Sequence, residues 1–405
     1  MREVKTVLLL VVTAIGFMTI ADETRAIQGE IDAAAAKGGG CVTVGPGVHD
    51  CGTLWLKCGV ELHLEKGAVL RGPSDWRAYD DVDDPRIGKR PEGSKKVFIA
   101  AFDAENVAIT GEGTIDGQGL CFYDVNSASN GSFFAKPPHP RPRMLEFFRC
   151  KGVRLEGIEL KDSPGWTCWL RECEDVVASH LRVHGDQRMI NNDGLHVDGC
   201  RRVRIGESTF RTGDDCIIMR ANVAEGKSLV CEDMVVSNCV LDSNCQCIRL
   251  SCPSDDLIRN GFFKNLKMSG STGVLSHHPA RYVVPWNEGC ARMENIVVED
   301  CEIDVRHHPV YFGVDPGVRL HSFGNTVFRN VRMRGGKPIV LKGTADAVLR
   351  NMRFENMTAD IAAVTPVETA AVEGLEFRDC TIRSEKGESV PFRRPDSNTW
   401  ESKRW

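Results

Sequence analysis

The sequence lacks the charge and hydrophobic signals of several protein classes. Lys and Arg (51 residues) do not outnumber Asp and Glu (56 residues), so no basic excess exists to neutralise a nucleic-acid backbone. Beyond the N-terminus, no apolar run is long enough to span a membrane. With 42% hydrophobic and 26% charged residues, the composition excludes a disordered or collagen-like chain. We expect a globular protein with no nucleic-acid partner and no membrane span.

The N-terminus has the pattern of a secretory signal peptide. Arg2 and Lys5 precede a short apolar run, which Ala21 closes with a small residue. This pattern predicts a signal peptide over residues 1–21, a single mature domain over residues 22–405, and a secreted or periplasmic location. A short hydrophobic helix of the mature fold is the alternative.

The cysteines do not form a recognisable metal-binding or disulfide framework. There are 17, an odd number, and their spacings match no zinc-ligand pattern. Because several recur at equivalent positions of the repeat described next, we expect most to be small buried apolar residues. A disulfide from Cys41 to Cys51 or Cys58 remains open.

A short pattern with the alternation of a β-strand returns along the chain from residue 150 onward. It is seen in Gly157–Leu160, His180–Val183 and Asn265–Met268. Such a strand cannot bury its apolar face alone, whereas stacked copies bury one continuous core. The pattern recurs roughly every 23 to 35 residues, at Ile158, Leu181, Ser208, Cys239, Leu266, Cys301, Val331, Met357 and Cys380.

The repeat predicts an all-β solenoid, and a parallel β-helix fits it best. Leucine-rich repeats need more leucines and a helix in each unit, and propeller blades need four strands in about 40 residues. Apolar spacing predicts one helix, over about residues 26–37, which would cover the open end of the solenoid. The tail, over about residues 385–405, is expected to form an irregular cover at the other end.

Three aspartates on successive coils form the densest candidate site. Aligning the apolar alternation of Leu195 with that of Ile217 places Asp193 beside Asp215, with Asp214 next to it. Coils about 4.8 Å apart bring these carboxyl groups together, and like charges so close raise at least one pKa. Glycoside hydrolysis uses such a proton donor beside an ionised base. The alternative is that the acids only stabilise turns through their own backbone.

The residues that carry this site resemble a known family. The chain reads Asn-Asn-Asp at 191–193 and Gly-Asp-Asp-Cys-Ile at 213–217, and it is similar to the polygalacturonase family, family 28 of the glycoside hydrolases. Similarity extends to Gly111–Gly117 and to Asp162–Trp166. The resemblance implies a single-stranded, right-handed parallel β-helix of the pectin-lyase-like type. It also implies hydrolysis with inversion, in which Asp214 is the acid while Asp193 and Asp215 hold the attacking water.

Two motifs of that family are replaced in this sequence. Where a Gly-His-Gly is expected, the chain reads Asn244–Leu250, so that Gln246 takes the histidine position, or Cys245 if the register slips by one. Where an Arg-Ile-Lys is expected to clamp a substrate carboxylate, Gly273–His277 stands instead. The clamp is therefore lost or replaced by His277 alone.

Outward-facing positions on successive coils predict a groove that contains cationic groups. His196, Arg220, Arg249 and His277 align there, and together with Gln246 they are the candidate substrate-binding residues. Forked arginine donors suit a saccharide that carries a carboxylate or a sulfate. We expect a pectic or other acidic glycan rather than plain homogalacturonan. Each arginine could instead be a surface residue paired with a neighbouring aspartate.

The alternatives to a polysaccharide or oligosaccharide hydrolase are a lyase and a non-catalytic protein. A β-helix lyase would use the acids to bind Ca²⁺ and would release an unsaturated product. A carbohydrate-binding or tailspike-like β-helix would use them for stability only. Our first hypothesis requires no cofactor and no metal, and it expects a monomer. Inserts at residues 117–143 and 279–290 are expected to close one end of the groove, which favours attack at a chain end.

Overall fold

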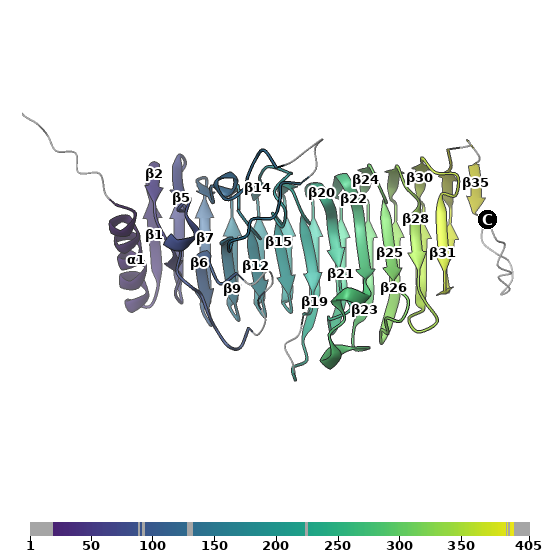
Figure 1. Cartoon of the computed structure of the whole chain (residues 1–405), viewed down its shortest axis with the longest axis horizontal. Coiled ribbons are helices and arrows are strands. Elements are labelled where there is room, and N and C mark those ends of the chain that lie inside the picture. The colour runs from purple at the N-terminus through teal and green to yellow at the C-terminus, as the bar shows by residue number, and fades with distance from the viewer. Residues whose placement is uncertain are drawn as a thin grey trace, which may run out of the picture.

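A computed structural model describes residues 19–87, 90, 94–127, 133–222, 226–385, 387 and 389–392. Most of the expected signal peptide, residues 1–18, lies outside this part of the chain. The described chain forms an elongated stack of coils, with α1 (Ile20–Ala36) at one end and the C-terminal strands at the other (Figure 1). Strands of successive coils pair in parallel, and the coils wind in the right-handed sense. The fold is therefore the expected parallel β-helix.

Each coil contributes strands to three walls. The first wall consists of β1 (Gly40–Val44), β4 (Val60–Leu64), β7 (Glu105–Gly111), β10 (Lys151–Glu156), β13 (Glu174–Ser179), β16 (Arg201–Gly206), β19 (Val230–Ser237), β21 (Leu257–Lys264), β23 (Arg292–Glu299), β26 (Ser322–Arg329), β29 (Leu349–Glu355), β32 (Val372–Glu373) and β33 (Glu376–Arg378). The second wall consists of β2 (Gly47–Asp50), β5 (Ala68–Arg71), β8 (Thr114–Asp116), β11 (Glu159–Lys161), β14 (Arg182–His184), β17 (Thr209–Thr212), β24 (Glu302–Val305), β27 (Arg332–Gly335), β30 (Thr358–Ile361), β34 (Cys380–Arg383) and β35 (Ser389–Phe392).

The third wall positions the site. It consists of β3 (Leu54–Trp55), β6 (Val97–Phe102), β9 (Arg143–Phe148), β12 (Cys168–Arg171), β15 (Leu195–Asp198), β18 (Ile217–Arg220), β25 (Val310–Val314), β28 (Ile339–Lys342) and β31 (Val367–Ala370). The second and third walls are joined by two long strands that bend through both, β20 (Val240–Leu250) and β22 (Lys267–His278). Short 3-10 turns lie in the connections: η1 (Trp76–Ala78), η3 (Gly119–Phe122), η4 (Ala280–Tyr282) and η5 (Pro285–Asn287).

The repeat marks the bend between the first and second walls. Each buried marker residue follows a residue in the left-handed backbone region, such as Asn238, Asn265 or Asn330, with φ between 51° and 55° at these three positions. Asn and Asp tolerate this conformation better than other residues that carry a Cβ. Their side chains also stack from coil to coil, as Asn265 Nδ2 donates to Asn238 Oδ1 at 2.7 Å. The sequence pattern therefore specifies both the turn and the stack.

One continuous core fills the β-helix from α1 to β34. Inward residues of all three walls, including Val176, Leu70 and Val197, are fully buried and belong to a single cluster. Toward the C-terminal end, the rings of Phe328 and Phe354 stack with centroids 5.0 Å apart. Such stacking buries apolar area that a single coil could not bury.

The two ends differ in detail from the expected boundaries. Helix α1 begins at Ile20, six residues before the predicted start, and it buries Ile27 and Ile31 against the first coil. At the other end, part of the expected irregular tail forms β35, which pairs antiparallel with β34. No helix among the described residues is long and apolar enough to cross a bilayer.

The cysteines follow the expectation of buried apolar residues. Twelve of the seventeen are buried, and all seventeen are free thiols. Cys150, Cys173 and Cys200 precede equivalent strands of the first wall, and the Cys173 backbone N–H donates to Cys200 Sγ at 3.3 Å. The predicted alternative, a disulfide from Cys41 to Cys51 or Cys58, is not formed.

Candidate active site

The three aspartates lie where the chain passes from the second wall to the third. The backbone N–H of Gly194 donates to Asp215 O at 2.9 Å, and that of Cys216 donates to Gln246 O at 2.9 Å. These bonds set Asp193, Asp215 and Gln246 side by side on three successive coils. We call these three residues the acidic row.

Two glycines allow the coils to approach each other closely at this point. A Cβ at Gly194 would lie 2.2 Å from Cys216 O, and one at Gly213 would lie 2.2 Å from Met189 O. Contacts this short with backbone atoms cannot be relieved by a side-chain rotation. The glycines next to the aspartates therefore fix the separation at which the carboxyl groups face one another.

Asp214 and Asp215 form a pair of unequal carboxyl groups. Asp214 is partly exposed, and it accepts hydrogen bonds from the backbone N–H of Asp215 at 3.0 Å and of Asn191 at 3.2 Å. The Asp215 side chain is 1% exposed, and burial together with the charge of Asp214 raises its pKa to about 7. Arg249 opposes this rise in the pKa of Asp215 from 3.3 Å away. Near neutral pH the pair therefore holds a proton that an isolated aspartate would have lost.

Cys245 occupies the space beside this pair. Strand pairing between β20 and β22 shifts register between Ser243 and Gln246, and this irregularity turns Cys245 toward the carboxylates. Gln246 continues the acidic row, and its Oε1 accepts from Cys245 Sγ at 3.1 Å. Burial and the surrounding carboxylates raise the pKa of the thiol, which is therefore neutral. Both residues considered for the histidine position thus lie at the site.

His196 and Trp166 border the site on the preceding coils. His196 Nε2 lies 3.1 Å from Asp193 Oδ1, and the His196 and Trp166 rings stack with centroids 3.5 Å apart. Burial, helped by nearby arginines, lowers the pKa of His196 well below its ordinary value. The imidazole is therefore neutral and held in place at physiological pH.

The other candidate binding residues are held by partners of their own. Arg220 binds the fully buried Asp255 through Nε and Nη2, with contacts of 3.0 and 2.7 Å to the same carboxylate oxygen. His277 Nε2 lies 3.1 Å from Asp315 Oδ1. Of the two predicted arginines, Arg249 is the one that contacts an aspartate of the site, Asp215. The partner of Arg220 lies 35 positions away in the sequence, so no local signal could have indicated it.

Asp214, Asp215 and Cys245 are also the described residues that could hold a metal ion. One ligand atom from each lies within 4.8 Å of the others. Calcium prefers six to eight oxygen ligands, whereas a thiol suits softer ions. The donor set therefore does not fit the calcium site of a lyase.

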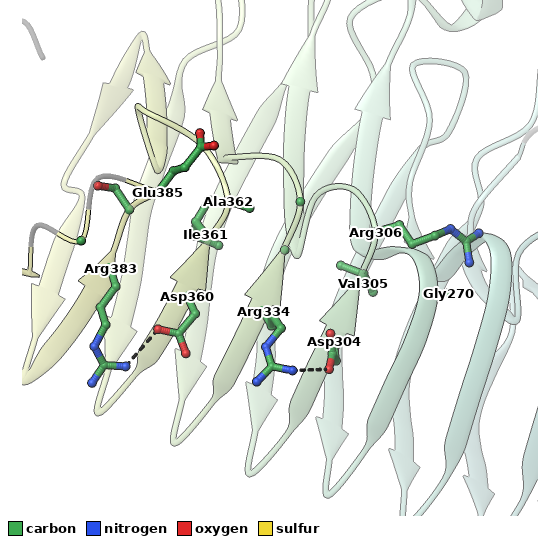
Figure 2. A pocket seen from close by; sticks show the side chains of 14 residues that line it. Gly270, Asp304, Val305, Arg306, Arg334, Asp360, Ile361, Ala362, Arg383 and Glu385 are labelled. Carbon is green, nitrogen blue, oxygen red and sulfur yellow. Dashed lines mark hydrogen bonds and ion pairs between the residues drawn. The ribbon is translucent and has the colours of Figure 1, made fainter.

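A hollow lies far along the chain from these aspartates. It has a volume of about 720 Å³ and is lined by residues of β24, β27, β30 and β34 (Figure 2). Arg334 lies 3.1 Å from Asp304, and Arg383 lies 2.9 Å from Asp360. These four residues stand in register on four successive coils, and we call them the alternating row. Because its charges cancel in pairs, the hollow offers no excess charge to attract an ionic ligand.

Comparison with known proteins supports the family resemblance. The sequence profile of the glycosyl hydrolases family 28 matches residues 86–244, which include all three aspartates. A polygalacturonase of Persea americana is 32% identical over 124 residues, which are 31% of this chain and 26% of that protein. Over these residues the chain is similar to the family 28 glycosyl hydrolases. The match to the family profile ends just before Cys245, where the sequence departs from the expected histidine motif.

Matches that extend over more of the chain have lower sequence identity. A polygalacturonase of Malus domestica is 22% identical over 343 residues, which are 78% of this chain and 66% of that protein. The structure of an exopolygalacturonase from Thermotoga maritima matches with a TM-score of 0.76 at 18% identity, over 91% of this chain and 88% of that one. A polygalacturonase from Erwinia carotovora matches with a TM-score of 0.62 at 16% identity, over 89% and 93% of the two chains. These structures share the fold.

Proposed function

We propose that the protein hydrolyses O-glycosidic bonds with the carboxyl groups of Asp193, Asp214 and Asp215. The observation that carries this proposal is the carboxyl pair, in which a buried Asp215 with a pKa of about 7 stands beside a partly exposed Asp214. Hydrolysis needs a proton for the leaving oxygen and a carboxylate for the water, and this pair supplies both near neutral pH.

The exposure of each carboxyl group suggests its role. Asp214 is the partly exposed member of the pair, and through it the proton that the pair holds passes to the leaving glycosidic oxygen as the bond to the anomeric carbon breaks. Asp193 and Asp215 orient a water molecule, whose oxygen bonds to the anomeric carbon from the opposite face while its proton passes to a carboxylate. The result is hydrolysis with inversion of configuration. Neutral Cys245 stands beside the acids without adding charge.

The outward residues of the groove favour a substrate other than plain homogalacturonan. Beyond Arg249, the next outward residues of the third wall are Leu275 and Tyr311, and His277 is bound to Asp315. A carboxylate on the neighbouring sugar would meet a leucine where the family places a cation. We infer a pectic or other acidic glycan whose sugar at this position carries no free carboxylate, with Arg249 as the cationic contact.

A substrate screen tests the function. Purified protein is incubated with pectic, sulfated and neutral polysaccharides, while reducing ends and ultraviolet absorbance are followed together. The expected result is new reducing ends without an ultraviolet signal, unaffected by a chelator. An unsaturated product, or loss of activity with a chelator, would instead indicate a lyase. Unchanged hydrolysis by an Asp214→Asn variant would falsify the assignment of the carboxyl pair.

Export through the signal peptide remains a prediction. The expected cleavage before Asp22 falls within the first turn of α1, whose N-terminus is capped by the hydroxyl of Thr19. The N-terminal sequence of the protein recovered from the culture medium or periplasm of an expressing bacterium tests both export and the cleavage position. Recovery of the uncleaved chain in the cytoplasm alone would contradict it.

A further inference from the structure

The outward side chains of the third wall form a continuous row across the coils. Cross-strand register joins each member to the next, and we call the set the outer row. Its members are Ala100, Glu146, Trp169, His196, Ile218, Arg249, Leu275, Tyr311, Val340 and Glu368. Side chains that point away from a β-helix face solvent unless another part of the chain covers them.

Burial along the outer row changes abruptly at the aspartates. The five members from Ala100 to Ile218 are buried, and Glu146 and Trp169 are 0% exposed. The next three members, Arg249, Leu275 and Tyr311, are partly exposed. The groove is therefore open on the C-terminal side of the carboxyl pair and closed on its N-terminal side.

The closed side is covered by the connection between β5 and β6. Val82 packs against Val97 and Ala100, and Ile87 packs against Trp169. The cover also contains a buried ion pair, because the Arg90 guanidinium lies 2.8 Å from both carboxylate oxygens of Glu146. Breaking such a buried pair leaves an unpaired charge and is strongly unfavourable, so this cover is a fixed part of the structure.

The insert between β8 and β9 secures the closed side next to the acids. Arg141 Nη2 donates to Asn191 Oδ1 at 2.9 Å, and Tyr123 Oη donates to Ile190 O at 2.6 Å. The insert is thus bonded to the segment that leads into Asp193. This is one of the two inserts expected to close the groove, whereas the cover between β5 and β6 was not expected.

Trp166 forms the end of the open groove. It is partly exposed, it stacks on His196, and it stands one coil before Asp193 and two coils before Asp215. Trp166 also packs against the cluster of Ile87, Phe148 and Trp169, so the cover reaches this point and the substrate chain cannot continue past it.

We propose that the protein removes single sugar units from one end of its substrate chain. The inference rests on the proposed hydrolysis and adds its mode of action. The terminal unit occupies the closed space between Trp166 and Asp214, and the remaining units extend over Arg249, Leu275 and Tyr311. An internal bond cannot reach the acids, because the units on its far side would collide with the cover.

Product analysis tests this inference. The probes are pectic oligosaccharides, both partially methyl-esterified and rhamnose-containing, labelled at the reducing end with a fluorophore. From the earliest times we expect free monosaccharide and a series of labelled or unlabelled chains shortened one unit at a time. Fragments of intermediate length at early times would overturn the inference and leave the hydrolase proposal intact. Absence of hydrolysis on every polysaccharide tested would contradict the hydrolase proposal itself.

Blocked chain ends and one substitution sharpen the test. Capping the end that enters the closed space should abolish cleavage, whereas an enzyme that attacks internal bonds would still cut the capped chain. Trp166→Ala should lengthen the closed space and shift the early product from monosaccharide to a mixture with disaccharide. Trp286→Ala, on an exposed tryptophan of the loop after β22, is the matched control and should leave the product size unchanged.

Discussion

The acidic row and the alternating row are both built by stacking one side chain per coil, and they differ in sign pattern and exposure. In the acidic row, Asp215 is buried and has Asp214 beside it along the chain, and burial together with the charge of Asp214 raises the pKa of Asp215 to about 7. In the alternating row, opposite charges face one another in water, and Asp304 and Arg334 are 64% and 70% exposed. Exposed pairs of this kind contribute little to stability.

The comparison shows that the same stacking of coils can build the candidate active site in one place and a row of surface ion pairs in another. Parallel stacking about every 4.8 Å forces equivalent residues of neighbouring coils into contact, whatever their charge. Opposite signs satisfy each other there, whereas like signs under cover keep a proton available. Substitutions can break this contrast at either row.

The largest effect is expected from removing the exposed member of the carboxyl pair. Asp214→Asn should lower kcat by at least about 10²-fold, the loss typical of a missing general acid. Asp304→Asn, an equal change in the alternating row, is the matched control and should leave kcat unchanged. Steady-state kinetics on the best substrate from the screen measures both. Equal losses in the two variants would show a stability effect rather than lost chemistry.

Next in size is the pH dependence of folding at Asp215. Its pKa is raised in the folded state, so folding favours the protonated form, and this stability is lost as pH rises from about 4 through about 7. Asp215→Asn removes the ionisation, and it should gain up to about 4 kcal/mol relative to the parent between pH 4 and pH 8. Urea unfolding at several pH values measures this. If the free energy of unfolding changes with pH in the same way for both proteins, Asp215 is ionised throughout this pH range.

A smaller effect is expected from removing the cation that stabilises ionised Asp215. Arg249 opposes the effects of burial and of Asp214, so Arg249→Gln should raise the pKa of Asp215 further. The alkaline limb of the kcat profile should move to higher pH, alongside a loss of substrate affinity. Arg334→Gln in the alternating row is the control, and its pH profile should match that of the parent. A lower kcat with no shift of the alkaline limb would show that Arg249 acts only by binding the substrate.

The smallest effect is expected in the alternating row itself. Arg383→Ala breaks an ion pair with Asp360 that is about half exposed on both sides. The free energy of unfolding should fall by less than about 1 kcal/mol, and the loss should shrink further at high salt. Chemical denaturation at low and high ionic strength measures the change. A loss of several kcal/mol would mean that this row also carries stability.

The sequence was sufficient to predict what repeats from coil to coil. The left-handed Asn and Asp turns, the buried marker positions and the alternation of Leu195 with Ile217 are local signals, and they led to the β-helix and to the alignment of Asp193 with Asp215. Features that depend on irregular or distant segments could not be predicted. The sequence left open whether Gln246 or Cys245 takes the histidine position, and the register shift brings both to the site. Arg220 on β18 binds Asp255, which lies in the connection after β20. The cover over Trp169 comes from a segment about 80 residues earlier.

Inward and outward side chains alternate along the four residues of strand β18. Ile217 and Met219 face the core, whereas Ile218 and Arg220 face outward. Where the outward positions are open to solvent, as at Leu275 and Tyr311, they can therefore change which sugar the groove accepts without altering the packing that holds the coil. A designer could re-engineer substrate choice in this scaffold by rewriting those open positions, coil by coil, and leaving the interior and the covered positions as they are.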